Sequence, residues 1–269
     1  IRNYAFDLSD KSYITISNIS VFAATITTNS NSMNIILDRL KVQYVSHFVT
    51  LPPVPEEYLK LYWLTNPATH SHFHDSGVRL MGANSVIQNS IIEYSAGHGI
   101  VLGAAGCVAD NNLVHDISYG GTYACGIQPT RCDAPQSITH NTIYRTGRTG
   151  IDGIGSNKDI GYNDIYDFGL INTDLGAIYS ANDLNLSGTR IHHNWLHDAK
   201  NDINHRYPVG AGIYLDQNAR PVQIDHNVFW NNNKNDIRVD QNSAPHNMIY
   251  NNTMVSNPPD FWFSLHAYI

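Results

Sequence analysis

The chain has 269 residues, of which 14% are charged, and its formal net charge at pH 7 is −7. This negative balance disfavours nucleic acid and anionic membrane surfaces as partners, because both repel an acidic protein. No apolar run approaches the roughly 20 residues that a membrane-spanning helix needs. The length fits one elongated domain, residues 1–269, which we expect to be monomeric.

Strand-like alternation begins close to the start of the sequence, at residues 13–19, and neither end shows an evident capping segment. The terminal units of a repetitive β protein need caps. We therefore expect this chain to be part of a longer protein.

The alternation lapses at residues 48–75, which we expect to form an inserted loop or a short helix. This segment ends in His70, His72 and His74, which would share one face if the chain were extended there. Imidazoles at that spacing could hold Zn²⁺ or Ni²⁺, and the alternative is a polar loop edge. We assign no metal and no cofactor.

A short phrase recurs seven times after residue 85: an apolar residue, two further residues and an asparagine, at intervals of 22 to 33 residues. A drifting period is typical of a solenoid with loops of variable length, whereas a β-sandwich does not keep one residue at one phase. Apolar and polar residues alternate within each unit, which favours stacked parallel strands. We predict an all-β, right-handed parallel β-helix, with a ladder of side-chain amides at equivalent turns made by Asn89, Asn111, Asn141, Asn163, Asn194, Asn227 and Asn251.

A second phrase, Gly-Ile or a close variant, runs in phase with the first, as at Gly99, Gly126, Gly150 and Gly212. Glycine permits a tight corner and the isoleucine enters the core. Alternation then predicts an outward column of Val101, Gln128, Asp152, Tyr179, Tyr214 and Arg238. A second outward column is expected to contain Gly103, Thr130, Ile154, Ala181, Asp216 and Asp240.

Three cysteines and three glycosylation sequons bear on the compartment. Cys107 and Cys132 lie at similar phases of adjacent coils, so a disulfide between them is possible, while the third cysteine, Cys125, cannot pair within the chain. The sequons begin at Asn18, Asn185 and Asn251, and the last is expected to be inaccessible within the ladder. We expect a secreted or periplasmic protein.

Three segments resemble a known group of proteins: Asn172 to Tyr179, Ile191 to Asp198 and Gly212 to Asp216. They look like right-handed parallel β-helix proteins of the pectate-lyase-like superfamily, over about residues 76 to 255. Within it the chain is most similar to β-helix glycoside hydrolases such as the α-L-fucosidase and xylanase group. There, an Asp-x-Gly-x-Ile-Tyr phrase and a Gly-Ile-Tyr-Leu-Asp phrase place carboxylates on the groove, which implies Asp174 and Asp216 here.

The sequence departs from the motifs of two other groups in this superfamily, the polygalacturonases and the pectate lyases, and these departures narrow the implied activity. Asn-Thr-Asp at 172–174 and Gly-His-Gly at 97–99 resemble polygalacturonase phrases, but their order is reversed and the later phrases of that family are missing. The Trp-Ile-Asp-His phrase of pectate lyases is also missing. A glycoside hydrolase therefore remains the implied activity.

Glycoside hydrolysis needs one carboxylic acid to protonate the leaving oxygen and one carboxylate to act as nucleophile or water base. On the face that carries the two outward columns, the candidates are Asp152, Asp174, Asp216 and Asp240. We predict Asp174 and Asp216 as the catalytic pair, with Asp152 in support. Asp174 is displaced into the turn before its strand, so we expect the longer carboxylate separation that accompanies inversion of configuration. The regularly spaced turn acids are interpreted as structural caps: Asp116, Asp167 and Asp198.

A polysaccharide or oligosaccharide substrate is the expected partner, and several side chains near the same face could contact it. These are Tyr179, Tyr214, His98, Gln128, Arg131, Arg238 and Asp240. Tyr179 and Tyr214 could offer an aromatic sugar-binding surface. Two alternatives stay open. One is a polysaccharide lyase acting on a uronate polymer, in which Arg131, Arg238 or His98 would neutralise the uronate or act as the base. The other is a non-catalytic carbohydrate-binding or adhesin solenoid.

Overall fold

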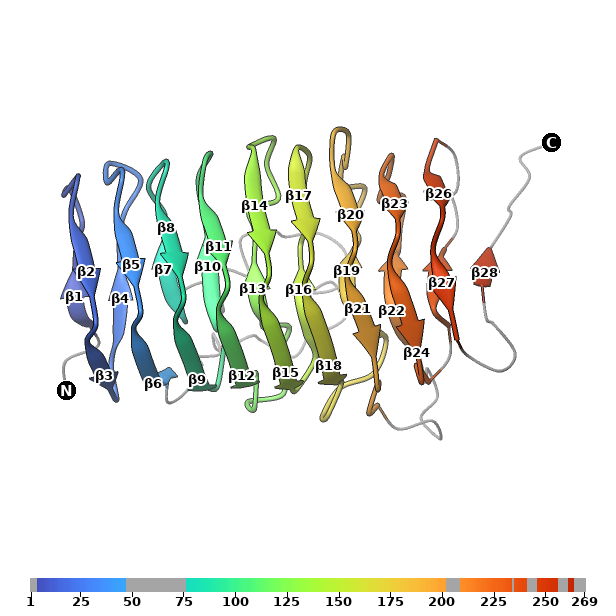
Figure 1. Cartoon of the computed structure of the whole chain (residues 1–269), viewed down its shortest axis with the longest axis horizontal. Coiled ribbons are helices and arrows are strands. Elements are labelled where there is room, and N and C mark those ends of the chain that lie inside the picture. Colours follow the sequence, from blue (N-terminus) through green and yellow to red (C-terminus); the bar gives the residue numbers. More distant parts are fainter. Residues whose placement is uncertain are drawn as a thin grey trace, which may run out of the picture.

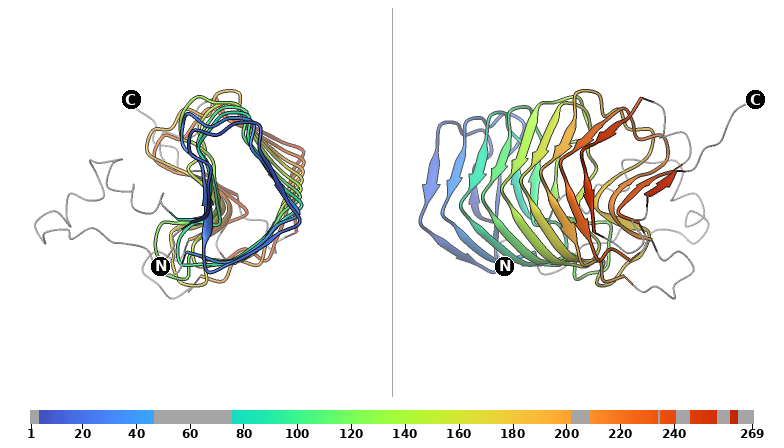
Figure 2. Two further views of the ribbon diagram at one scale, coloured as in Figure 1. Left: turned by 90° about the vertical axis from the view of Figure 1, so that its left-hand side faces the viewer. Right: turned by 45° about the vertical axis from the view of Figure 1, so that its right-hand side comes forward.

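The computed structural model describes residues 4–46, 76–201, 209–233, 235–240, 246–255 and 261–263. Over these residues the chain winds into a right-handed parallel β-helix, as the repeat predicts, and every coil adds one strand to each of three sheets (Figure 1). Figure 2 shows the coils stacked in register along one axis. The predicted insertion at 48–75, with His70, His72 and His74, lies outside the described residues. In the described part, no helix is both long and apolar enough to cross a membrane.

The sheets are all parallel. Sheet 1 contains β1 (Tyr4–Asp7), β4 (Thr25–Thr27), β7 (Val78–Leu80), β10 (Ile100–Leu102), β13 (Cys125–Gln128), β16 (Thr149–Asp152), β19 (Leu175–Ser180), β22 (Gly210–Leu215), β25 (Ile237–Val239) and β28 (Phe261–Phe263). Sheet 2 contains β2 (Thr15–Ser17), β5 (Ile36–Asp38), β8 (Val86–Gln88), β11 (Val108–Asp110), β14 (Gln136–Thr139), β17 (Lys158–Gly161), β20 (Arg190–His192), β23 (Gln223–Asp225) and β26 (Met248–Tyr250). Sheet 3 contains β3 (Ser20–Phe22), β6 (Lys41–Ser46), β9 (Ile91–Ser95), β12 (Leu113–Ile117), β15 (Thr142–Thr146), β18 (Asp164–Phe168), β21 (Trp195–His197), β24 (Val228–Trp230) and β27 (Thr253–Met254).

The asparagine ladder lies between sheets 2 and 3, and its register differs from the prediction in three coils. It consists of Asn112, Asn141, Asn163, Asn194, Asn227 and Asn252, each amide donating to the next side-chain oxygen at 2.9–3.0 Å. Asn89, Asn111 and Asn251 precede the ladder position by one residue and are exposed. The assignment was wrong there because the phrase was counted from its first apolar residue, whereas the inward residue is the second.

Main-chain contact explains the glycines that precede the core isoleucines. A Cβ on Gly150 would lie 2.5 Å from the Ile165 side chain and 2.9 Å from the Ala177 carbonyl oxygen, so no larger residue fits. Gly99, Gly126 and Gly212 are confined in the same way. These glycines are therefore required for the close approach of neighbouring coils, and not for an unusual backbone conformation.

The second predicted outward column is wrong at Ile154. This side chain is fully buried in the main core, because the chain turns through a positive φ of 78° at Gly153 just before it. Further along the same column the prediction holds, since Asp240 donates its backbone N–H to the carbonyl of Leu215 and so lies beside Asp216.

The three cysteines are free thiols, so the possible Cys107–Cys132 disulfide is not formed. Cys107 is buried, with its Sγ 3.2 Å from the carbonyl oxygen of Gly82, whereas Cys132 is exposed. Asn251 is exposed as well, together with Asn18 and Asn185. The expectation that the Asn251 sequon is inaccessible was wrong, for the same one-residue reason as the ladder.

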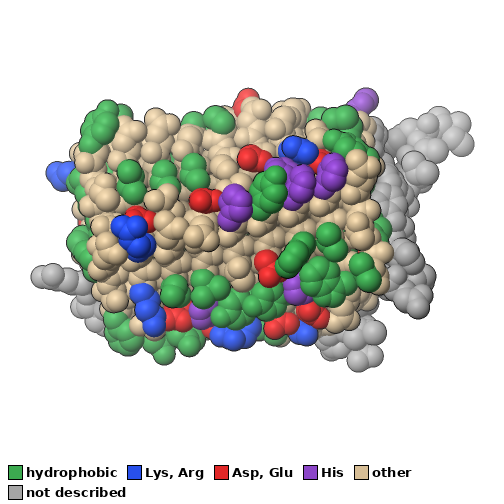
Figure 3. Space-filling model, in the orientation of Figure 1, with side chains coloured by type: hydrophobic (Ala, Val, Ile, Leu, Met, Phe, Trp, Pro, Cys, Tyr) green, Lys and Arg blue, Asp and Glu red, His purple; other side chains and the backbone are tan. Residues whose placement is uncertain are grey.

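Two rows of stacked rings run along the face formed by sheets 2 and 3 (Figure 3). One row follows the turn between the sheets and contains His140, Tyr162, His193 and His226, with ring centroids 4.9–5.1 Å apart. The other follows sheet 3 and contains His115, Tyr144, Tyr166, His197 and Trp230, at 3.8–5.2 Å. Contact between successive rings stabilises the stacking of coils, and the four rings of the first row remain exposed to solvent.

Candidate active site

The first outward column of sheet 1 forms as the Gly-Ile phase predicts. Strand pairing gives the order Arg79, Val101, Gln128, Asp152, Tyr179, Tyr214 and Arg238 along the axis. Most of this column is buried, including the carboxylate of Asp152 and the amide of Gln128. Seen along the axis, turns at both edges of sheet 1 reach farther out than the sheet itself (Figure 2).

Asp152 is neutralised by an arginine. Its Oδ2 lies 2.7 Å from Nη1 of Arg148, and the side chains are only 7% and 4% exposed. Nη2 of the same guanidinium donates to the backbone oxygen of Asp174 at 3.1 Å. The guanidinium carbon also lies 4.5 Å from the ring centre of Tyr123 and 4.8 Å from that of Tyr179. Asp152 is thus held inside the protein rather than presented to a ligand.

Asp216 differs from Asp152 because, within the described part of the chain, no lysine, arginine or histidine forms an ion pair with it. It follows β22, is partly exposed, and its Oδ2 accepts a hydrogen bond from the Tyr179 hydroxyl at 3.0 Å. Burial, followed by the negative charges of Asp174 and Asp240, raises the pKa of Asp216 to about 6, against the opposing hydrogen bond from Tyr179. A carboxyl with that pKa exchanges its proton in the weakly acidic range.

Asp174 is the carboxyl that repels Asp216. It precedes β19, is exposed, and has a φ of 59°. The protein packed around its carboxyl raises its pKa, while the positive charges of Arg148 and Arg238 act in the opposite direction. The two aspartates that the sequence singled out are therefore linked by charge, since Asp174 raises the pKa of Asp216.

Asp240 is neutralised like Asp152. Its Oδ2 accepts hydrogen bonds from the Tyr214 hydroxyl at 2.7 Å and from Nη2 of Arg238 at 2.9 Å. The Arg238 guanidinium also lies 4.9 Å from the centre of the Tyr214 ring. Asp240 and Arg238, one coil beyond Asp216, therefore form a bonded unit with Tyr214 of β22.

The expected open aromatic surface at Tyr179 and Tyr214 is not present. The two rings are 9% and 3% exposed and meet edge to face, with centroids 5.2 Å apart. They pack with Ala181, Val209 and Ala211 in a small apolar cluster of their own. Their hydroxyls, not their faces, reach the carboxylates.

The remaining predicted binding residues lie toward the N-terminal coils. His98 is buried, and its Nδ1 accepts the backbone N–H of Cys125 at 3.0 Å. Arg131 and Gln128 lie over Gly153, where a Cβ would be 3.0 Å from the arginine Nε and 3.2 Å from the glutamine Nε2. These side chains come from the coil of β13, two coils before Tyr179 and three before Asp216.

Sequence reasoning missed Arg148 and Tyr123. A signal existed, since Arg148 stands four residues before Asp152 with opposite charge. Alternation could not use it, because Gly150 lies between them and faces the core, so the strand does not keep one face over these five residues.

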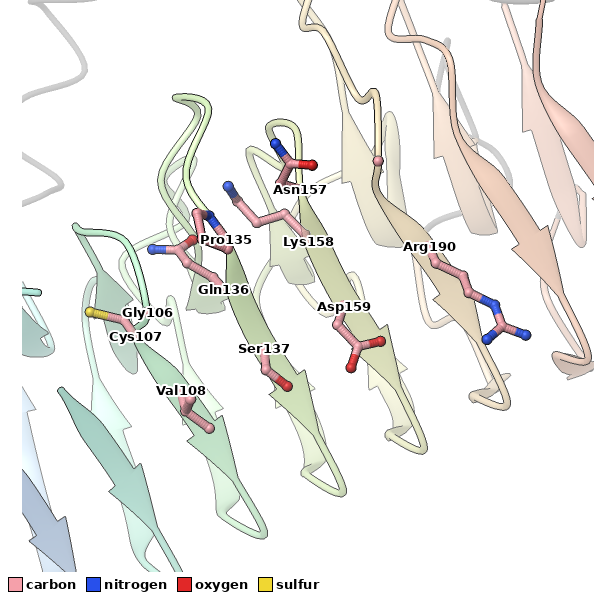
Figure 4. A pocket seen from close by; sticks show the side chains of 11 residues that line it. Gly106, Cys107, Val108, Pro135, Gln136, Ser137, Asn157, Lys158, Asp159 and Arg190 are labelled. Carbon is pink, nitrogen blue, oxygen red and sulfur yellow. The ribbon is translucent and has the colours of Figure 1, made fainter. Parts of the chain in front are cut away.

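A separate depression of about 520 Å³ lies on the sheet 2 side, lined by residues of β11, β14, β17 and β20 (Figure 4). None of the predicted catalytic residues lines it. Its charged groups are already bonded: Lys158 donates to three backbone carbonyls, Asp159 contacts His192, and Arg190 contacts Asp225. The column on sheet 1 is therefore the better candidate for chemistry.

Comparisons with known proteins give fold neighbours but no family. No family model and no curated protein sequence matches the chain. Among solved structures, one described as a glycoside hydrolase is similar over 86% of this chain, with 13% identity and a TM-score of 0.53. A mutant of the periplasmic alginate epimerase AlgG is similar over 92% of this chain, with 12% identity and a TM-score of 0.58.

This chain covers 38% of the glycoside hydrolase chain and 55% of the epimerase chain. At this level of identity the likeness concerns the path of the backbone alone. It shows that the stacked parallel sheets of this chain follow the same β-helical fold as those two structures.

Proposed function

We propose that this protein is a carbohydrate-active enzyme that cleaves a glycosidic bond by hydrolysis, with Asp216 as general acid and Asp174 as base or nucleophile. The names of the two structural neighbours support the substrate class, since one is a glycoside hydrolase and the other acts on alginate. The fold alone does not select the reaction, because one fold can host several chemistries.

One observation carries the proposal: the four aspartates near the column fall into two kinds. Asp152 and Asp240 are each paired with an arginine, at 2.7 and 2.9 Å. Asp174 and Asp216 have raised pKa values, and the charge of one raises the pKa of the other. Two neighbouring carboxyls whose surroundings separate their proton affinities are the arrangement that acid–base catalysis requires.

The roles follow from the charges around each group. Asp216, with a pKa of about 6, can carry the proton that the leaving glycosidic oxygen takes up as its bond to the sugar breaks. Arg148 and Arg238 favour the ionised form of Asp174, which then removes a proton from attacking water or attacks the sugar itself. We retain inversion as the expected outcome, which proton NMR of the first-formed sugar anomer would test.

The experiment is a screen of neutral and acidic polysaccharides with the wild-type chain, Asp174→Asn and Asp216→Asn. Each replacement should lower kcat by roughly 10²- to 10⁴-fold. Asparagine tolerates the positive φ at position 174, so the fold should be kept. Asp198→Asn is the matched control, since this turn aspartate also has a positive φ but contacts His197 on sheet 3. Near-normal rates in both site variants would contradict the assignment.

The same screen separates the alternatives. A lyase would form an unsaturated product that absorbs in the ultraviolet, without consuming water. Both arginines nearest the carboxylates are already bonded to Asp152 and Asp240, which leaves neither free to neutralise a uronate. Binding without turnover of any glycan would support a carbohydrate-binding solenoid instead.

We also infer a monomeric protein that acts outside the cytoplasm. All three sequon asparagines are exposed, which supports glycosylation if the chain enters a eukaryotic secretory pathway. Secretion from a eukaryotic host, followed by glycosidase treatment and gel mobility, would test accessibility, and light scattering would test the oligomeric state.

A further inference from the structure

Arg148 is the most extensively engaged side chain in the candidate site. It is 4% exposed, and it makes an ion pair with Asp152, a hydrogen bond to the backbone of Asp174, and cation–π contacts with Tyr123 and Tyr179. Three of these four partners belong to other coils. One guanidinium therefore contacts residues from the turn before β13, from β16, from the turn before β19 and from β19 itself.

We propose that Arg148 is a positioning residue that connects the two carboxyls of the acid–base pair. Through Nη2 it holds the carbonyl of Asp174, and through its stacking on Tyr179 it holds the phenol that donates to Asp216. This inference rests on the proposed function, and adds to it how both carboxyls are held relative to each other.

The burial of the Arg148–Asp152 pair supports this role. Burying two charges costs desolvation free energy that their attraction often does not repay, and an apolar pair of similar size is often as stable. Stability alone therefore does not explain a buried pair at this position. An arginine is suited to the position because its planar fork reaches two acceptors at once while its faces stack on rings. A lysine could supply the charge without that geometry.

The positive charge of Arg148 affects the pKa of Asp174 more than that of Asp216. It favours the ionised form of Asp174, whereas Asp216 responds mainly to its burial and to the neighbouring aspartates. The charged and titratable groups that interact with Asp174 are Arg148, Arg238, Asp240, Asp216, Tyr123, Tyr179 and Tyr214. A change at Arg148 should therefore move the acidic limb of the pH profile and leave the alkaline limb in place.

The test uses Arg148→Met combined with Asp152→Asn, so that no buried charge is left uncompensated. The double variant should fold, shift the acidic limb of kcat/KM upward by about one pH unit, and lower kcat by about ten- to a hundred-fold with little change in KM. Asp152→Asn alone leaves the Arg148 charge unbalanced and should shift the same limb downward. An unchanged pH profile in the folded double variant would overturn the proposal.

Two further variants separate geometry from charge and from general effects of arginine loss. Arg148→Lys should keep the acidic limb near its wild-type pH but lower kcat. Arg145→Met removes an arginine three residues away that pairs with Asp116 on the sheet 3 side, so its pH profile should match the wild type. A shift equal to that of the double variant in this control would contradict a local role for Arg148.

A readout that needs no turnover keeps this inference distinct from the proposed function. Carbon-13 NMR of aspartate-labelled full chain follows the Asp174 carboxyl as pH changes. Its titration should move upward by about one unit in the double variant and downward in Asp152→Asn. If the wild type hydrolyses no carbohydrate, the proposed function fails; if the Asp174 titration is the same in all variants, the role of Arg148 fails.

Discussion

Sheets 1 and 3 both carry outward residues in register, yet they use charge differently. On sheet 3 and its turns the arrangement repeats: stacked rings run along the strands, and Asp116, Asp167 and Asp198 follow at one phase with φ values of 49–56°. They contact Arg145, Lys200 and His197 at the surface, as expected for structural turn acids. On sheet 1 the outward residues vary in size and charge along the column, and the Arg148–Asp152 ion pair is buried.

This difference distinguishes structure from function within one solenoid. A feature that recurs in every coil serves the stacking that all coils share. A feature that occurs once, and that requires charges to be removed from water, needs another explanation, because repetition does not supply it. The following predictions compare the same type of change at two places in the solenoid.

The largest difference is expected for the loss of an arginine. Arg148→Met leaves the Asp152 carboxylate buried without its partner and should lower the free energy of unfolding by about 3–5 kcal/mol. Arg145→Met breaks a pair whose side chains are 45% and 23% exposed, and should cost about 1 kcal/mol or less. Denaturant unfolding of both variants measures the difference, and equal losses would show that the buried pair is not special.

The ladder provides the next largest effect. Asn194→Leu removes the amide between Asn163 and Asn227, leaves buried partners unbonded, and should cost about 1–3 kcal/mol. Asn111→His changes an exposed residue whose equivalents in later coils include His140 and His193, and should alter stability by about 0.5 kcal/mol or less. A larger loss at Asn111 than at Asn194 would contradict the ladder register.

Opposite pH dependence is expected for Asp216, which follows β22 of sheet 1, and Asp225, which ends β23 of sheet 2. The folded pKa of Asp216 is raised to about 6, so its ionisation on going from about pH 4 to 6 weakens the fold. Asp216→Asn should therefore be the more stable protein at pH 7, by about 1 kcal/mol. The pKa of Asp225 is lowered by Arg190, His226 and Gln223, so its stabilisation is present at pH 7 and lost as the pH falls through the lowered value. Asp225→Asn should be less stable at pH 7, and thermal melts from pH 3 to 8 measure both signs.

The smallest effect is expected from removal of a single hydroxyl. Tyr179→Phe deletes the donor to Asp216, whose pKa that hydrogen bond lowers, so the alkaline limb of the rate profile should move upward by about half a pH unit. Tyr166→Phe, in the ring stack of sheet 3, should leave the profile unchanged. An unmoved limb in Tyr179→Phe would show that Asp216 does not govern it.

The repeat sufficed to predict the fold and the first column, because strand pairing preserves the phase of Gly-Ile from coil to coil. It failed where two apolar residues stand side by side, as in Val86-Ile87, Val108-Ala109 and Met248-Ile249, since only pairing with the next coil shows which one faces inward. Ile154 was misplaced for a related reason, as the turn at Gly153 breaks alternation.

The candidate site was predictable in part. Asp174 and Asp216 were chosen by resemblance and placement, and their catalytic role stays a prediction, although the charge of Asp174 raises the pKa of Asp216. The Arg148 contacts could not be predicted, because they join residues that come from three successive coils and depend on how turns fold over the column. The burial of Tyr179 and Tyr214 likewise depends on Val209 and Ala211, which lie at the start of β22.

The glycines of sheet 1 fix the spacing of the side chains on its outer surface. Because the backbones of neighbouring coils touch at Gly99, Gly126, Gly150 and Gly212, the interval between successive outward side chains is fixed by the main chain at about 4.8 Å. Replacing one outward residue changes the side chain at that position but leaves the spacing of the other positions unchanged. An extended polymer lying along sheet 1 would meet outward side chains at equal intervals. A single substitution would then change its contact with one part of the polymer only.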